Sequence, residues 1–245
     1  MKLIIFYVLL LCSAVVNAQY FEVPSAGSEP TKTFLIEAPK SKATVVFFQG
    51  GDGVLNIQPD GSNNRTNSPM IRSGALWKQY GINYVMVDSP YDLGDYRRTN
   101  KRGNADHLDR AEAVVRFYKN KFNVPIWIYG HSMGTVTVTK LANRSGNSLE
   151  LAGVIIAGTH DGETVSAEFN KPVLAIHHKR EACPGTPISA SEAIIKSRPA
   201  STKSELVMID GGDNTGHPCA GLAYHGFNNV EDQVVDAAAK FILSH

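Results

Sequence analysis

The chain has 245 residues, of which 43% are hydrophobic and 19% charged, a balance that suits one ordinary globular domain and excludes a disordered chain. Its 24 basic and 23 acidic side chains give a formal net charge of +1, and no long run of either sign occurs. Surfaces that bind nucleic acid or anionic lipid usually carry such a run, so neither partner is expected.

The start of the chain has the composition of an export signal. Lys2 is a positive first residue, Leu3 to Val16 form an apolar stretch, and Ala18 ends a small-residue cleavage site. The apolar stretch is shorter than the ~20 residues that span a bilayer, so no stable membrane anchor is expected. The sequence therefore predicts a signal peptide at 1–18, one mature domain at 19–245, and a secreted or periplasmic location.

Three cysteines occur in the chain, and Cys12 would leave with the signal peptide. Cys183 and Cys219 would then remain in an oxidising compartment, where disulfides form and persist. We expect these two to be bonded to each other. N-glycosylation sequons begin at Asn64 and Asn143, and they have meaning only in a eukaryotic secretory pathway.

Short apolar runs rich in β-forming residues alternate with helical patterns from about Thr33 onward. Strands are predicted at Thr33–Glu37, Ala43–Gln49, Asn83–Val87, Pro125–Tyr129, Leu151–Ala157, Pro172–His177 and Glu205–Ile209. Helices are predicted near His107–Phe122, Met133–Asn143, Ala190–Ser197 and Val230–Leu243. This alternation is typical of a mostly parallel central sheet with helices on both faces. The long irregular stretch from Asp52 to Ser73 follows a strand directly, so it can lie over a site at that edge.

A Gly-x-Ser-x-Gly motif at Gly130–Gly134 follows one predicted strand and precedes a predicted helix. The motif alone has little weight, but this setting is that of a nucleophile elbow. In such an elbow the serine occupies a strained turn, and the glycines avoid clashes between neighbouring Cβ atoms. Ser132 is therefore predicted to be a catalytic nucleophile.

A serine hydroxyl reacts at neutral pH only beside a base that is itself held by an acid. In the predicted fold the base belongs to the loop after the last strand, which contains His217 and His225. We favour His225, just before the closing helix, over His217.

The acid should follow the strand that ends at His177. Glu181 is the only carboxylate between that strand and the next helix, which makes it the first choice. Asp161, after the preceding strand, is the second choice, and Asp210 and Asp213 share the loop of the histidine. The role is to hold the imidazole and stabilise its charged form, which glutamate can do.

An oxyanion hole needs two backbone N–H groups aimed at one point. The residue after the nucleophile, Met133, is expected to supply the first. The second should come from the glycine-rich segment Gln49–Gly53 at an early strand end, where Gly51 is favoured and Gly50 is the alternative. This segment lacks the Gly-Lys-Ser/Thr ending of a phosphate-binding loop.

A zinc site is the other chemistry that these loops suggest. Its ligands would be drawn from His177, His178, Cys183, His217 and Cys219. The spacing lacks a Cys-x-x-Cys or His-Glu-x-x-His core, so neither a metal nor an organic cofactor is expected.

Four places in the sequence resemble the α/β-hydrolase superfamily and, more narrowly, a group of exported bacterial α/β hydrolases of poorly defined activity. They are Gln49–Gly53, Gly130–Gly134, His177–Cys183, and Pro218–Cys219 with Tyr224–Phe227. The resemblance covers most of the mature chain and implies the α/β-hydrolase fold. In such relatives an aspartate usually stands at the position of Glu181, and Thr and Arg often flank the serine where this chain has His131 and Met133.

The sequence thus predicts a serine hydrolase that cleaves a small-molecule carboxylic ester through an acyl-enzyme. Too few residues separate Ala157 from Pro172 for a sizeable lid, which argues against a lipase. Two alternatives stay open: a peptidase or thioesterase that uses the same three residues, and a non-catalytic binding protein that kept the fold. The binding protein is disfavoured, because it would need neither Ser132, nor His225, nor the glycine loops.

Overall fold

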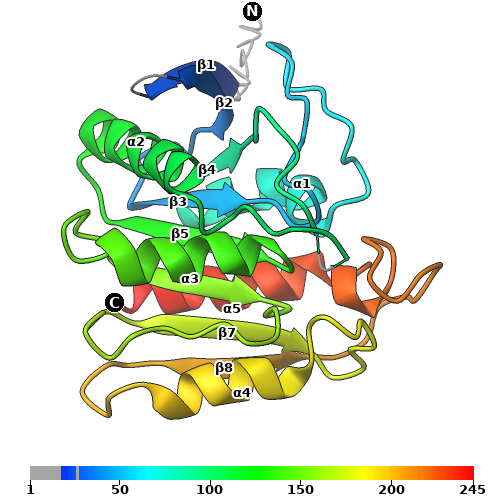
Figure 1. The fold of residues 1–245 in the computed structure, drawn as a ribbon. Helices are drawn as coiled ribbons and strands as arrows, with labels where there is room; N and C mark the ends of the chain where they lie inside the picture. Colours follow the sequence, from blue (N-terminus) through cyan, green and yellow to red (C-terminus); the bar gives the residue numbers. More distant parts are fainter. Residues whose placement is uncertain (1–17, 26–27, 96) are drawn as a thin grey trace, which may run out of the picture.

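Strands and helices alternate along most of the chain, as the sequence pattern predicts (Figure 1). The computed structural model describes residues 18–25, 28–95 and 97–245, so the predicted signal peptide lies outside it except for Ala18. The strands are β1 (Ala18–Ser25), β2 (Ser28–Ile36), β3 (Ala43–Phe48), β4 (Ile82–Val87), β5 (Ile126–His131), β6 (Gly153–Ala157), β7 (Val173–His178) and β8 (Glu205–Ile209). The helices are α1 (Pro69–Arg72), α2 (Ala105–Phe122), α3 (Gly134–Ser145), α4 (Ile188–Ser197) and α5 (Glu231–Leu243), with 3-10 helices η1 (Gly74–Tyr80) and η2 (Tyr224–Gly226).

The described strands form one sheet in the order β1-β2-β4-β3-β5-β6-β7-β8. The run from β4 to β8 is parallel, whereas β1 and β2 pair antiparallel at one end of the sheet. Parallel strands present their carboxyl ends at one edge of the sheet. The loops that follow β3, β5, β7 and β8 therefore meet there, and these loops contain the predicted site residues.

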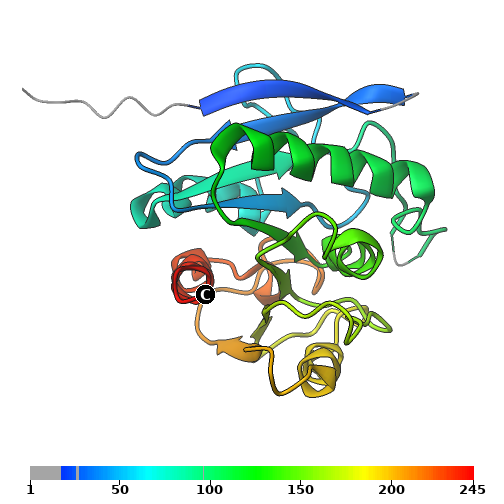
Figure 2. The same ribbon diagram turned by 90° about the vertical axis from the view of Figure 1, so that its left-hand side faces the viewer.

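Helices cover both faces of the sheet: α2, α3 and α4 lie on one side, and α1, η1 and α5 on the other (Figure 2). Successive side chains of β5 point to opposite faces. Trp127 and Tyr129 pack in the core under α5, whereas Ile126 and Ile128 pack in the core under α2 and α3. Burial on both faces explains why the central strands are continuous apolar runs in the sequence.

The predicted fold class is confirmed, and each predicted strand and helix is present within a few residues. The segment between β6 and β7 contains no helix, in agreement with the expected lack of a lid. Four elements were not predicted. β1 is an edge strand with Val23 as its only buried described residue, so it lacks an apolar alternation. α1, η1 and η2 are too short for a helical period. In the part of the chain that is described, no helix is long and apolar enough to cross a bilayer.

Candidate active site

Ser132 occupies a sharp turn between β5 and α3. Its φ is +55°, a left-handed value that costs energy for a residue other than glycine, and its N–H donates to the Ala157 carbonyl at 2.9 Å. A Cβ on Gly130 would lie 2.4 Å from the Gly134 carbonyl oxygen, and one on Gly134 would lie 2.1 Å from the Phe48 carbonyl oxygen. The sequence motif is therefore a steric requirement of this turn.

His225 and Glu181 form a buried pair at the same edge of the sheet. His225 Nδ1 lies 2.9 Å from Glu181 Oε2, and both side chains are only 2% exposed. Because an ionised carboxylate can only accept, Nδ1 is the donor in this pair. This contact selects the tautomer with the proton on Nδ1, so Nε2 is the ring nitrogen that can act as a general base.

The loop after β7 holds the Glu181 carboxylate. Its Oε1 accepts the backbone N–H groups of Ala182 at 2.9 Å and Cys183 at 2.8 Å. Burial raises the pKa of Glu181, but the hydrogen bond and charge of His225, with the Cys183 N–H, outweigh burial and hold the pKa below its ordinary value. Glu181 is therefore ionised at neutral pH.

The alternative residues lie elsewhere. His217 is exposed, and its Nδ1 accepts the Cys219 N–H at 3.2 Å. Asp161 is exposed, Asp210 pairs with Lys179 at 3.2 Å, and Asp213 accepts a hydrogen bond from Asn229. The structure brings Glu181 to His225, and it brings none of these carboxylates there.

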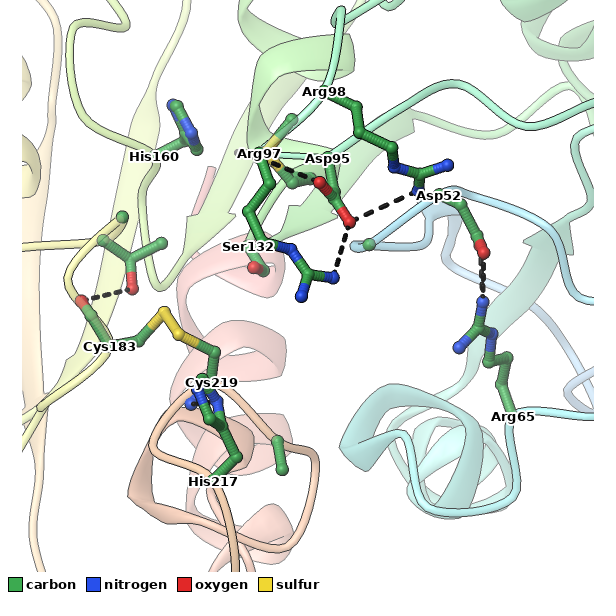
Figure 3. A pocket seen from close by; sticks show the side chains of 15 residues that line it. Asp52, Arg65, Asp95, Arg97, Arg98, Ser132, His160, Cys183, His217 and Cys219 are labelled. Atoms are coloured by element: carbon green, nitrogen blue, oxygen red, sulfur yellow. Dashed lines mark hydrogen bonds and ion pairs between the residues drawn. A yellow bond between two sulfur atoms is a disulfide. The ribbon is translucent and has the colours of Figure 1, made fainter.

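Ser132 lies where two hollows meet, one of about 440 Å³ and one of about 320 Å³. In the larger hollow, Ser132 lies between the Cys183–Cys219 disulfide on one side and an ion pair of Asp95 with Arg97 on the other (Figure 3). The smaller hollow is lined by both Ser132 and His225. Within the described residues the Ser132 hydroxyl has no hydrogen-bond partner, His225 included, so it is open to an incoming ligand.

The glycine loop after β3 packs against the elbow. Gly51 has φ +57° and lines both hollows, and a Cβ on Gly50 would lie 2.9 Å from the Cβ of Ser132. Among the described residues, no hydrogen bond uses the N–H groups of Gly50, Gly51 or Met133. These three donors are therefore available beside the serine.

The long irregular stretch borders the site. Arg65 pairs with both carboxylate oxygens of Asp52, at 2.5 and 2.6 Å, and both residues line the larger hollow. The buried carboxylate of Asp88, at the end of β4, accepts the backbone N–H groups of Leu55 at 2.6 Å and Ile57 at 2.9 Å. Asp88 thus anchors the start of this stretch without lining either hollow.

Sequence reasoning missed three residues that touch His225, and one of them is Thr186, whose Oγ1 lies 3.2 Å from His225 Nδ1. His131 is fully buried, and its Nε2 donates to the His225 carbonyl at 2.9 Å; burial lowers its pKa to about 3, so the ring is neutral. Gly158 has φ +53°, and a Cβ there would lie 3.2 Å from His225 Cε1. His131 occupies a variable position of the Gly-x-Ser-x-Gly motif and Gly158 lies outside every motif, so no sequence pattern signals these contacts between distant segments.

A disulfide joins Cys183 to Cys219, with their Cα atoms 4.7 Å apart. It connects the loop that carries Glu181 with the loop that carries His225, as the sequence predicts. With both sulfurs bonded, the zinc arrangement weighed from the sequence has lost two of its ligands. No group of three metal-binding side chains occurs among the described residues.

Removing the disulfide with the double change Cys183→Ser and Cys219→Ser should lower both stability and turnover. The chain-entropy model assigns about 4 kcal/mol to a loop of this length. Turnover should fall as well, because the Cys183 N–H holds Glu181. Urea unfolding and ester hydrolysis measure the two effects. A stability loss with unchanged kcat would leave the disulfide without a role in aligning the site.

Stability should fall in acid because of buried neutral histidines. Burial and the nearby Arg102 charge lower the pKa of His107 to about 3, whereas an unfolded histidine titrates near ~6.5. The unfolded chain therefore binds more protons between these values, and stability is lost as the pH falls. His107→Gln keeps a donor for Thr137 but has no imidazole to titrate. Between ~pH 7.5 and ~pH 5 the free energy of unfolding of this variant should therefore fall by about 2 kcal/mol less than that of wild type. Urea unfolding of both proteins at both pH values measures the two losses. Equal losses of unfolding free energy in the variant and in wild type would contradict this expectation.

Solved structures with the same fold are numerous, although no family model and no curated protein matches the sequence. A dienelactone hydrolase from Anabaena variabilis superposes with a TM-score of 0.64 at 13% identity, over 93% of this chain and 98% of that one. An esterase from Pyrococcus furiosus gives 0.65 at 12% identity, over 94% and 93%. An α/β serine hydrolase without a lid from Xanthomonas campestris gives 0.57 at 12% identity, over 94% of both chains. The chain therefore has the α/β-hydrolase fold.

Proposed function

We propose that this α/β-hydrolase-fold protein is a serine esterase that works through an acyl-enzyme, with Ser132 as nucleophile, His225 as general base and Glu181 as the acid that orients it. The observation that carries the proposal is the buried Glu181–His225 hydrogen bond beside a serine in a strained, glycine-flanked turn. A protein that only binds a ligand has no use for this combination. The compared structures, which are named as esterases and hydrolases, support the same reaction class.

The proposed reaction has two halves. Ser132 Oγ attacks the ester carbonyl while His225 Nε2 accepts the hydroxyl proton, and ionised Glu181 stabilises the resulting imidazolium. The N–H groups of Met133 and either Gly51 or Gly50 hold the negative charge of the tetrahedral intermediate. The imidazolium then protonates the leaving alcohol. A water, activated by the same histidine, releases the acid and restores the serine.

The cellular setting is also a proposal. We assign residues 1–18 to a signal peptide and residues 19–245 to the exported domain, in the periplasm or outside the cell. The Cys183–Cys219 disulfide supports export, because such bonds persist in oxidising compartments.

The proposed substrate is a short, polar ester. Polar side chains predominate among the described residues that line the two hollows, including Asp52, Arg65, Asp95, Arg98 and His160 in the larger one and Asn64, Asn67 and Ser68 in the smaller. An apolar acyl chain gains affinity with each methylene only where it meets an apolar wall. Long acyl chains therefore find little to bind beside Ser132.

On p-nitrophenyl esters, kcat/KM should be at least about tenfold higher for the acetate than for the octanoate. Ser132→Ala is the control for hydrolysis that does not depend on the site. Equal or rising values with chain length would contradict the polar-substrate assignment. A thioester and a peptide amide in the same panel decide between the esterase and the alternative acyl hydrolases.

A further inference from the structure

Arg102 lies behind the glycine loop, in the segment between β4 and α2, and its side chain is almost completely buried at 1% exposure. One terminal nitrogen donates to the backbone carbonyls of Gln49 at 3.0 Å and Gly51 at 2.8 Å. The other donates to Thr137 Oγ1, on α3, at 2.9 Å. A single guanidinium thus joins the loop after β3 to the helix that follows the elbow.

This cation is buried without an anionic partner. No ion pair within the described residues includes Arg102, and its Nε has no hydrogen-bond partner. Burial, opposed by the charge of Asp52, lowers its pKa to about 9, so it still carries a positive charge at neutral pH. Burying a charge against neutral acceptors alone costs stability, which calls for another reason to keep it.

The contacts of Arg102 bear on the proposed oxyanion hole. In a trans peptide the C=O and N–H bonds point in opposite directions, so a held carbonyl also fixes the direction of the N–H in its own peptide. The Gln49 carbonyl shares its peptide with the Gly50 N–H, so Arg102 fixes the direction of that donor directly. The Gly51 carbonyl shares its peptide with the Asp52 N–H, so Arg102 holds the peptides on both sides of the Gly51 N–H. The contact with Thr137 ties this loop to α3, which begins directly after Met133, the first donor.

We propose that Arg102 is a positioning residue for the oxyanion hole, holding the Gln49–Gly51 loop against α3 so that the N–H groups of the loop and of Met133 converge beside Ser132. The inference rests on the proposed function. Arg102 lines neither of the two hollows that contain Ser132, so its positive charge acts from behind the loop, where it favours the negative charge that develops in the transition state.

Arg198 offers a matched control. It is buried at 8% exposure and donates to the backbone carbonyls of Val165, Ser166 and Phe169, and its Nε finds no hydrogen-bond partner among the described residues. It lines neither hollow beside Ser132. Arg102 and Arg198 thus make similar contacts, and only those of Arg102 involve the glycine loop.

The test compares Arg102→Met with Arg198→Met, and Arg102→Lys with Arg198→Lys, in full kinetics on p-nitrophenyl acetate. Each variant is first checked for cooperative unfolding. Methionine keeps the apolar stem without charge or donors, whereas lysine keeps the charge and a single donor group. Arg102→Met should reduce kcat at least about tenfold more than Arg198→Met, with KM changed less than about threefold, because loop misalignment affects the transition state more than ground-state binding. Arg102→Lys should recover part of the loss in kcat.

A kcat for folded Arg102→Met within about tenfold of that of Arg198→Met overturns the proposal. If Arg102→Met does not fold, the two lysine variants are compared instead. The kcat of Arg102→Lys should then be at least about threefold lower than that of Arg198→Lys, and a smaller difference overturns the proposal. Failure of the proposed function gives a different result, because wild type and Ser132→Ala would then hydrolyse the ester at the same rate.

Discussion

Ester hydrolysis by Ser132→Ala should fall by about 10⁴-fold or more relative to wild type, with the fold unchanged. Alanine removes the only atom that can form the acyl-enzyme, and the Ser132 hydroxyl makes no hydrogen bond in the described structure whose loss could destabilise it. Initial rates on p-nitrophenyl acetate and a thermal unfolding scan measure the two quantities.

The matched control is Ser148→Ala, because Ser148 is an exposed serine whose hydroxyl donates only to the Ser145 carbonyl at 3.0 Å, away from the site. It should keep the wild-type rate. Residual turnover of Ser132→Ala within tenfold of wild type would remove Ser132 from the mechanism.

His225→Ala should cost about as much activity as Ser132→Ala, because the nucleophile and its base act as one unit and their losses do not add. His217→Ala should cost less than about tenfold, since His217 is exposed and pairs with no carboxylate in the described part of the chain. The same ester assay ranks the variants. The reverse ranking would make His217 the base.

Loss of His225 also leaves Glu181 buried without its partner, so reduced activity of the alanine variant could reflect a damaged fold. His225→Asn separates the two effects, because its amide can still donate to Glu181 where Nδ1 does. This variant should remain folded and inactive. Folded His225→Asn with wild-type kcat would exclude a histidine base at this position.

The sequence was informative where local chemistry and chain order determine the structure. The elbow at Gly130–Gly134 combines a strand, a turn and a helix within a short window, so the position of Ser132 could be predicted without knowing any contact. The parallel sheet then places the loops after β7 and β8 side by side, which is why Glu181, His225 and the Cys183–Cys219 disulfide could be expected together.

The residues that the sequence did not indicate are those that act through contacts between distant segments. In the sequence, nothing distinguishes Arg102 from the other charged residues of its polar segment. Its contact with the glycine loop exists only in the folded chain. His131 occupies a variable position of the motif, yet it binds the carbonyl of His225. Hydropathy patterns report burial of apolar faces, and they carry no signal for a buried arginine or histidine whose partners lie far along the chain.

The central claim is that Ser132 is an activated nucleophile, and covalent labelling tests it most directly. The folded protein is incubated with a fluorophosphonate probe, digested and analysed by mass spectrometry, with Ser132→Ala and His225→Asn treated in parallel. We expect one phosphonylated site, on Ser132, with no labelling of Ser132→Ala and labelling slowed by at least about a hundredfold in His225→Asn. An unlabelled folded wild-type protein, or a label on another residue, would contradict the account.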